Sequence, residues 1–187
     1  MNINIDLSIR SKWHIGYKRE SSLSTIVVHG AGVVDSVENL ISWMLDGERK
    51  KEYIKGVALF HYAIDRNGEI TEIIDPKFWV YHSSCGKQDE RTIGIELING
   101  SPNNENTYTK EQYESLFWLI FDKLMEDYPS ITAIASHWRM KEKFSGGYKK
   151  NCPGNFDWDE LEVYMENHGY DYTHDERYES YWGIKKS

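Results

Sequence analysis

The sequence predicts an α/β fold: a single domain with a central mixed β-sheet flanked by α-helices. Short β-branched runs alternate with longer amphipathic segments along the chain, the pattern of a sheet covered by helices. The chain has 187 residues, 40% of them hydrophobic and 14% aromatic, which suffices for one sizeable core. The sequence has no internal repeat and no low-complexity linker that would divide it into two domains.

The first predicted elements are a strand and a helix. Residues 24–30, STIVVHG, form a β-branched run that ends at a glycine and predict a buried strand. Residues 35–45, DSVENLISWML, predict a helix, with Asp35 and Glu38 in the spacing of a capping box. The apolar residues of this helix form one face: Val37, Leu40, Ile41, Met44 and Leu45.

Two further strand regions follow. Residues 58–74, ALFHYAIDRNGEITEII, read as two strands around Asn67-Gly68, a dipeptide that favours a type I′ hairpin turn. Residues 91–98, RTIGIELI, predict another core strand.

The longest predicted helix covers residues 108–129. Thr109 and Gln112 have capping-box spacing at its start, and Pro129 ends it. Its inner face is expected to carry the apolar residues at helical intervals: Leu116, Ile120 and Leu124.

The last predicted elements are a strand over residues 130–137, SITAIASH, and a helix over residues 157–169. We expect Asp157 with Glu160 to cap that helix and Gly169 to end it. The polar, tyrosine-rich tail, residues 170–187, predicts no element.

Composition restricts the possible partners and compartment. A net charge of −8 and a pI near 5.4 argue against nucleic acid or anionic lipid as the main partner. Two cysteines are too few for a disulfide framework, although one bridge remains possible. The sequence has no apolar run of about 20 residues and no signal-peptide core near its start. We therefore expect a protein that is cytoplasmic in the producing cell, without membrane insertion.

Three residues with metal-binding chemistry fall at the ends of predicted elements. His29 ends the first strand, His137 ends the last, and Cys152 follows in a loop that turns at Pro153-Gly154. In α/β folds, functional groups gather where strands give way to loops. Two imidazoles and a thiolate suit zinc, and a fourth position left to water is the catalytic arrangement. The spacing is not a compact zinc signature, so two hydrogen-bonded histidines and a small buried cysteine are the alternative.

Several motifs occur together and in order: STIVVHG, FHYAIDRNGEI, YHSS, RTIGIELING, YTKEQYESL, ASHWRM and KKNCPGNFDW. Over residues 24–161 the chain resembles the zinc-dependent N-acetylmuramoyl-L-alanine amidases, the superfamily that also contains the phage lysozyme-type amidases and the peptidoglycan recognition proteins. The resemblance implies a mixed sheet with helices packed on it and a Zn²⁺ ion bound by His29, His137 and Cys152. We expect an amidase core over residues 24–161, then the C-terminal helix to about residue 169 and the polar tail.

The resemblance also implies two catalytic residues. Glu96, in Ile-Gly-Ile-Glu, corresponds to the acid–base residue, and Lys150, in Lys-Asn-Cys, to a residue that stabilises the oxyanion. The chain departs from both subgroups that it resembles. Phe60 stands where the phage lysozyme-type enzymes have a tyrosine, and Cys152 stands where the recycling amidases usually have an aspartate.

Other residues receive weaker expectations. His61 and His82 are candidates for substrate contact, although His61 could instead orient groups beneath the metal or pack in the hairpin. We expect Trp43 and Trp118 in the core. No catalytic role is expected for Cys85, and three histidines outside the matching motifs are expected on the surface: His14, His168 and His174.

The function that the resemblance implies is hydrolysis of the amide bond between N-acetylmuramic acid and the L-alanine of the stem peptide, by zinc-activated water. The substrate partner is then peptidoglycan or a muropeptide. A phage-type endolysin is the leading expectation, and no separate wall-binding module is apparent, which favours a thin peptidoglycan. The alternatives are a cytoplasmic muropeptide-recycling amidase, a non-catalytic peptidoglycan-binding recognition module and a Cys-His peptidase that uses Cys152.

Overall fold

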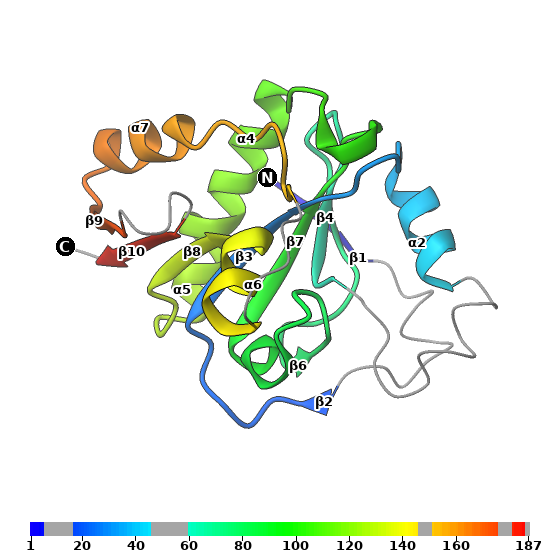
Figure 1. Ribbon diagram of the computed structural model, residues 1–187. Helices are drawn as coiled ribbons and strands as arrows, with labels where there is room; N and C mark the ends of the chain where they lie inside the picture. Colours follow the sequence, from blue (N-terminus) through cyan, green and yellow to red (C-terminus); the bar gives the residue numbers. More distant parts are fainter. Residues whose placement is uncertain (6–16, 46–59, 146–150, 176–180, 186–187) are drawn as a thin grey trace.

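A computed structural model describes residues 1–5, 17–45, 60–145, 151–175 and 181–185 of the chain (Figure 1). Its centre is an eight-stranded mixed sheet with the order β1-β5-β4-β7-β3-β8-β10-β9. These strands are β1 (Ile3–Ile5), β5 (Ile70–Glu72), β4 (Tyr62–Ile64), β7 (Thr92–Leu97), β3 (Thr25–Gly30), β8 (Ala133–Ser136), β10 (Tyr181–Lys185) and β9 (Asp171–His174). A two-stranded sheet pairs β2 (Tyr17–Lys18) with β6 (Phe78–Trp79).

The four central strands β4, β7, β3 and β8 run parallel to one another, and the strands next to them on either side, β5 and β10, run antiparallel to them. Helices flank this sheet, so the predicted mixed α/β architecture is confirmed. The helices are α2 (Val37–Leu45), α4 (Lys110–Phe117), the π-helical segment η3 (Trp118–Leu124), α5 (Met125–Asp127), α6 (His137–Ser145) and α7 (Asp159–Asn167). Two short 3₁₀ segments are η1 (Gly86–Arg91) and η2 (Pro102–Asn104). Within the described residues, no helix is long and apolar enough to span a bilayer.

Alternate residues of the central strands face two different helical layers. Val28 of β3 belongs to the same hydrophobic cluster as Ile120 of η3. Val27 belongs instead to a cluster with Met140 of α6, which lies in front of β3 in Figure 1, whereas α4 lies behind the sheet. His29 has the same parity as Val27 and therefore faces the α6 layer.

Helix α2 covers the same face as α6, farther along the sheet. Its predicted apolar face is confirmed, since Leu40 and Met44 are buried in a cluster with Ala63 of β4. Ala63 lies opposite Glu96 of β7 in the strand register. The α2 and α6 helices therefore border one stretch of the sheet, where the ends of β3 and β7 meet.

The start of α2 differs from the prediction. The helix begins at Val37, and the hydroxyl of Ser36 accepts a hydrogen bond from the Asn39 backbone N–H at 3.1 Å. Ser36 therefore caps the helix, in place of Asp35, whose carboxylate accepts from the Asn39 side chain at 2.8 Å. With the helix starting one residue later, Asn39 and not Glu38 occupies the third helical position.

The predicted hairpin is present as β4 and β5, but its turn is of another type. Gly68 has φ of 84°, whereas Asn67 is not among the residues with positive φ. Asp65 N donates to Glu69 O at 3.0 Å and Gly68 N donates to Asp65 O at 2.9 Å. A three-residue loop closes on a type I turn followed by a left-handed residue, so a type I′ turn is not needed.

The capping box of Thr109 and Gln112 is confirmed in both hydrogen bonds. The long helix begins at Lys110 and continues through η3 and α5 to Asp127, two residues before Pro129. Its predicted inner face is buried in the main core: Leu116, Ile120 and Leu124.

The C-terminal region differs most from the prediction. Helix α7 begins at Asp159, so Asp157 accepts from the Asp159 backbone N–H at 3.1 Å and does not form the expected box with Glu160. Gly169, with φ of 71°, follows the helix end as predicted. The tail adds β9 and β10 to the sheet, and Trp182 of β10 is buried in the main core.

Candidate metal centre and its pocket

The two histidines of the candidate centre come from neighbouring parallel strands. Val28 of β3 lies opposite Ser136 of β8 in the strand register. The residue that follows each of them is a histidine: His29 in β3, and His137 at the first position of α6. Their ring centroids are 4.5 Å apart. The predicted strand thus ends at Ser136, and the helix that begins there was not expected from the sequence pattern.

Cys152 reaches the histidines from a loop far along the chain. Its sulfur accepts a hydrogen bond from Gly30 N at 3.4 Å, and its carbonyl accepts from Trp138 N at 3.2 Å. Tyr108 holds the next residue, because its hydroxyl donates to the carbonyl of Pro153 at 2.6 Å. The thiol side chain is therefore tied to the ends of β3 and β8 and to the start of the long helix.

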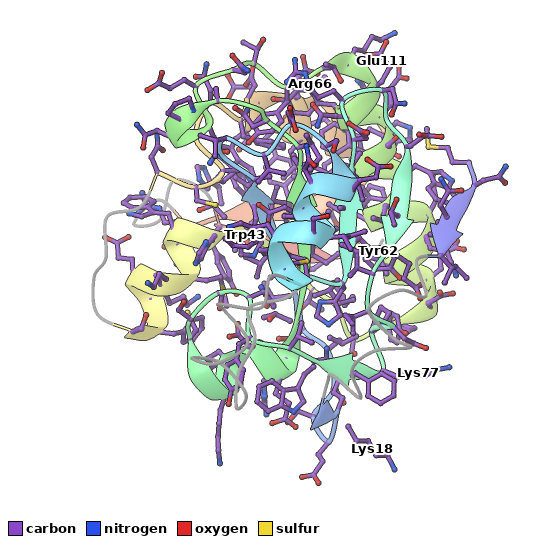
Figure 2. The ribbon with its side chains drawn as sticks, turned by 90° about the vertical axis from the view of Figure 1, so that its right-hand side faces the viewer. Lys18, Trp43, Tyr62, Arg66, Lys77 and Glu111 are labelled. Atoms are coloured by element: carbon purple, nitrogen blue, oxygen red, sulfur yellow. The ribbon has the colours of Figure 1, made fainter. Side chains whose placement is uncertain are left out.

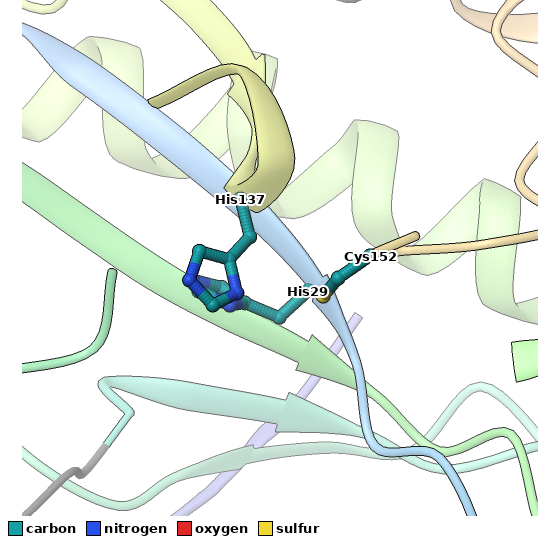
Figure 3. A group of neighbouring side chains, drawn as sticks. All are labelled: His29, His137 and Cys152. Atoms are coloured by element: carbon teal, nitrogen blue, oxygen red, sulfur yellow. The ribbon is translucent and has the colours of Figure 1, made fainter. Parts of the chain in front are cut away.

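The three side chains converge, as Figure 3 shows. One ligand atom from each of His29, His137 and Cys152 lies within 4.8 Å of the others. His29 and Cys152 are buried, and His137 is partly buried. Tetrahedral zinc, with bonds of about 2.0–2.3 Å, requires ligand atoms about 3.3–3.7 Å apart, so small side-chain shifts suffice. Two nitrogens and one sulfur are a donor set that zinc prefers, and the residues fit this metal.

Glu96 lies beside this group. It pairs with His29 in the register of β3 and β7, and its side chain lines the same pocket with only 3% of the residue exposed. Phe60 closes another side of the pocket, with its ring edge-on to His29 at a centroid distance of 5.1 Å. The pocket has a volume of about 260 Å³ and opens to solvent between α2, η2 and the Cys152 loop.

His82 also lines the pocket, but it is buried and both of its ring nitrogens have protein partners. Nδ1 lies 3.0 Å from Nε2 of His29, and Nε2 lies 2.7 Å from the hydroxyl of Thr92. Burial, and then the charges of His137 and Arg19, lowers the pKa of His82 to about 3. The ring is therefore neutral at ordinary pH.

His61 lies beneath this group and does not line the pocket. Its Nδ1 accepts from Gly94 N at 3.0 Å, and its Nε2 lies 3.1 Å from the carbonyl of Phe78. Burial, followed by the neighbouring His82 and Arg19, lowers the pKa of His61 well below its ordinary value. The geometry favours packing beneath the site over the substrate contact that the sequence also suggested.

Trp43 differs from the expectation of a core residue. It lies on α2 (Figure 2), 40% of it is exposed, and it lines the pocket. Trp118 is partly buried against the main core, closer to what was expected. The expectation for Trp43 was wrong because the sequence of an amphipathic helix does not show which edge of the helix borders a pocket.

Asn104 is a second contributor that the sequence did not reveal. Its side-chain oxygen accepts from Gly32 N at 2.6 Å, and its carbonyl accepts from Asn155 N at 3.0 Å. It thereby joins the loop after His29 to the loop after Cys152. Its φ of 58° is a conformation that asparagine tolerates, but the run SPNNEN reads only as a loop.

Lys150 and His14 are outside the described residues. His168 and His174 are exposed, as expected. Cys85 is a free, buried thiol whose pKa is raised by burial, and it packs with Val27, Ala135 and Met140.

Comparisons with known proteins show which sequences and folds the chain is similar to. Residues 19–155 match the family model described as N-acetylmuramoyl-L-alanine amidase (Amidase_2). No curated protein matches the chain.

Three solved structures illustrate the similarity in fold. The chain is 21% identical to the N-acetylmuramoyl-L-alanine amidase LysC from Clostridium intestinale URNW, with a TM-score of 0.67 over 89% of this chain and 98% of that one. It is 16% identical to the Ph2119 endolysin from Thermus scotoductus MAT2119 bacteriophage Ph2119, with a TM-score of 0.59 over 88% and 97%. It is 12% identical to a chain of the tracheal cytotoxin complex of peptidoglycan recognition proteins LCa and LCx, with a TM-score of 0.60 over 89% and 95%.

Proposed function

Because the chain belongs to the N-acetylmuramoyl-L-alanine amidase family, we propose that it hydrolyses the amide bond between N-acetylmuramic acid and the L-alanine of the stem peptide in peptidoglycan. The observation that carries this proposal is the convergence of His29, His137 and Cys152, with Glu96 next to His29 in one pocket. This combines three candidate zinc ligands and an acid–base residue at one opening.

The three converging side chains would hold a Zn²⁺ ion. When bound, such an ion lowers the pKa of water to about 7 and polarises a carbonyl oxygen. Cys152 as a thiolate with two neutral imidazoles leaves the site one net positive charge. The three candidate ligands come from β3, from the first residue of α6 directly after β8, and from a loop hydrogen-bonded to Gly30 and Trp138.

Glu96 has the position for proton transfer. A carboxylate there takes a proton from the attacking water as its oxygen bonds to the carbonyl carbon. It then gives that proton to the L-alanine nitrogen as the carbon–nitrogen bond breaks. Such acid–base catalysis contributes about 10²–10⁴-fold in rate. Burial of Glu96 among pocket residues keeps bulk water from competing for this proton.

One further residue, Lys150, completes the proposed machinery. Lys150 would stabilise the negative charge that develops on the carbonyl oxygen, a role that rests on the family motif Lys-Asn-Cys. Losing one such donor costs on the order of 3 kcal/mol of transition-state stabilisation. Phe60, which replaces the tyrosine of the phage lysozyme-type enzymes, has no hydroxyl for this purpose, so charge stabilisation falls to Lys150 and the metal.

The biological role we propose is that of a phage-type endolysin acting on the cell wall after release. The experiment treats purified intact peptidoglycan with the zinc-loaded protein and measures new N-terminal alanine and released stem peptides. We expect cleavage that a chelator abolishes and added zinc restores, with the Glu96→Gln variant as the inactive control.

Other outcomes identify other functions. Binding to peptidoglycan without new N-terminal alanine would indicate a recognition module. Cleavage that resists the chelator but is lost after thiol alkylation would indicate a Cys-His peptidase at Cys152. Cleavage of soluble anhydro-muropeptides but not of intact peptidoglycan would indicate a recycling amidase.

A further inference from the structure

We propose that His82 and Asp89 are positioning residues that fix the proton on Nε2 of His29, so that His29 presents Nδ1 to the metal. The inference rests on the proposed zinc site, but it concerns residues that neither bind the ion nor react. It assigns His82 a role different from the substrate contact suggested by the sequence.

The proton order follows from Thr92. Its hydroxyl donates to the backbone carbonyl of Asp89 at 3.2 Å, which uses the one proton that a hydroxyl has. We therefore assign His82 as the donor in the 2.7 Å contact between Thr92 Oγ1 and His82 Nε2. The Asp89 carboxylate, whose Oδ1 lies 3.7 Å from the same nitrogen, favours the same assignment. A neutral imidazole carries one N–H, so Nδ1 of His82 is an acceptor.

His29 is the donor to that acceptor. Its Nε2 lies 3.0 Å from Nδ1 of His82, so the proton between the two rings belongs to His29. A neutral His29 protonated at Nε2 has its lone pair on Nδ1. Metal-binding histidines commonly donate the other N–H in this way, which fixes the tautomer and the ring orientation.

Asp89 keeps the proton of His82 at Nε2. Its side chain is wholly buried, and Oδ1 lies 3.7 Å from that nitrogen. Oδ1 also accepts from Ser83 N at 3.1 Å and from the Ser83 hydroxyl, which holds the carboxylate against His82. Among the described residues, Oδ2 makes no hydrogen bond. Burying a carboxylate is costly unless hydrogen bonds from neighbouring groups compensate for the lost hydration.

The loop that contains His82 and Asp89 also fixes the tautomer of His137. Nε2 of His137 lies 3.2 Å from the carbonyl of Ser83, which can only accept. His137 is therefore protonated at Nε2 and also has its lone pair on Nδ1. One loop, residues 82–89, thus sets equivalent tautomers on both histidine ligands.

Neighbouring groups fix the orientation of the His82 ring. It lies directly on Gly94 of β7, where an added Cβ would come within 2.7 Å of the ring. Glycine at this position is therefore required by the close approach of the imidazole, and not by its own backbone conformation. The strand below and the Thr92 hydroxyl beside it together fix the plane of the ring.

The test measures zinc affinity by competition with a chromophoric chelator, which needs no turnover. We expect His82→Ala to weaken zinc binding about 10–100-fold, the usual effect of losing an outer partner of a ligand. His82→Asn should recover much of the affinity, because its Oδ1 can accept at the position of Nδ1. Asp89→Asn, which keeps an acceptor for Ser83 but removes the charge, should weaken binding about tenfold.

The control for a general loss of stability is Ile73→Val, a core variant in the cluster that includes α2. Its thermal stability without zinc is compared with that of His82→Ala, and it should bind zinc as wild type does. A second readout is the long-range ¹H–¹⁵N spectrum of the zinc-loaded protein with labelled histidine. It should show His29 protonated at Nε2 and bound to zinc through Nδ1.

The inference is overturned if His82→Ala binds zinc as tightly as the control, if His29 binds zinc through Nε2, or if His82 itself ligates the ion. Failure of the proposed function looks different: wild type would bind no zinc, or would bind it without cleaving peptidoglycan.

Discussion

Glu96 of β7 lies directly opposite His29 of β3 in a parallel strand pair, and both side chains face the layer that contains α6. The consequence is chemical as well as geometric. The proposed proton acceptor and a candidate metal ligand are held side by side by the backbone hydrogen bonds of the central sheet. Neither residue depends on a loop for its position.

This relationship predicts the behaviour of Glu96→Gln. The variant should bind zinc like wild type but lose about 10²–10⁴-fold in kcat, because glutamine cannot take up the proton of the attacking water. Steady-state hydrolysis of peptidoglycan and a zinc titration measure the two quantities. Glu69→Gln, at an exposed position in the hairpin loop, is the matched control and should keep full activity. Full activity in Glu96→Gln would exclude this residue from proton transfer.

Cys152→Ser tests whether the sulfur of Cys152 is a zinc ligand. A serine hydroxyl is a much poorer zinc ligand than a thiolate, so we expect loss of bound zinc and of hydrolysis together. Cys85→Ser is the matched control, since Cys85 is likewise buried and outside any disulfide but does not belong to the candidate ligand group. Metal content after dialysis, measured for both variants, gives the answer. Zinc retained at wild-type level in Cys152→Ser would exclude the sulfur as a ligand.

The buried His61 predicts how stability depends on pH. Burial holds its folded-state pKa well below 6.5, so as the pH falls below 6.5 the unfolded chain takes up a proton that the folded chain refuses. The free energy of unfolding should therefore fall with falling pH, by up to about 1.4 kcal/mol per pH unit for this group. Urea unfolding of the zinc-free protein between pH 7.5 and 5 measures this slope.

The comparison variant for this slope is His61→Asn, which keeps an acceptor for Gly94 N but does not titrate. Its unfolding free energy should depend less steeply on pH over the same range. Equal slopes in the two proteins would mean that His61 is charged in the folded state.

Trp43 predicts a separation of binding from chemistry. It lies on α2, lines the pocket and is 40% exposed, and it carries no group that could take part in proton transfer. Trp43→Ala should raise KM for polymeric peptidoglycan about tenfold, equivalent to about 1.4 kcal/mol, with kcat nearly unchanged. Trp43→Phe should keep most of the affinity. The exposed Val163→Ala on α7 is the control. An unchanged KM in Trp43→Ala would remove this side chain from substrate binding.

Much of the fold could be predicted because the relevant signals are local. The β-branched run before His29 and the capping box of Thr109 with Gln112 each depend on a few adjacent residues. The ligand group followed from strand ends, because parallel strands deliver their last residues to one edge of the sheet. The register between His29 and Glu96 could not be predicted, because it depends on pairing between distant segments.

The parts that the sequence did not reveal depend on tertiary contacts. Trp182 and Ile184 alternate in a five-residue strand that contains a glycine, too short a pattern to identify next to polar tyrosine-rich neighbours. Arg19 donates to the carbonyls of Pro76 and Phe78, although it lies in a polar stretch of the sequence, YKRESS, that predicts no such contact. The burial of Asp89 beside His82 likewise has no local signature.

The C-terminal hairpin has a practical consequence for handling the protein. β10 covers the side of β8 that would otherwise be an open edge, one residue before His137. A chain shortened ahead of Tyr181 would leave that backbone able to recruit a strand from another molecule, inviting aggregation. Affinity tags and fused targeting modules are therefore better joined beyond β10 than substituted for it.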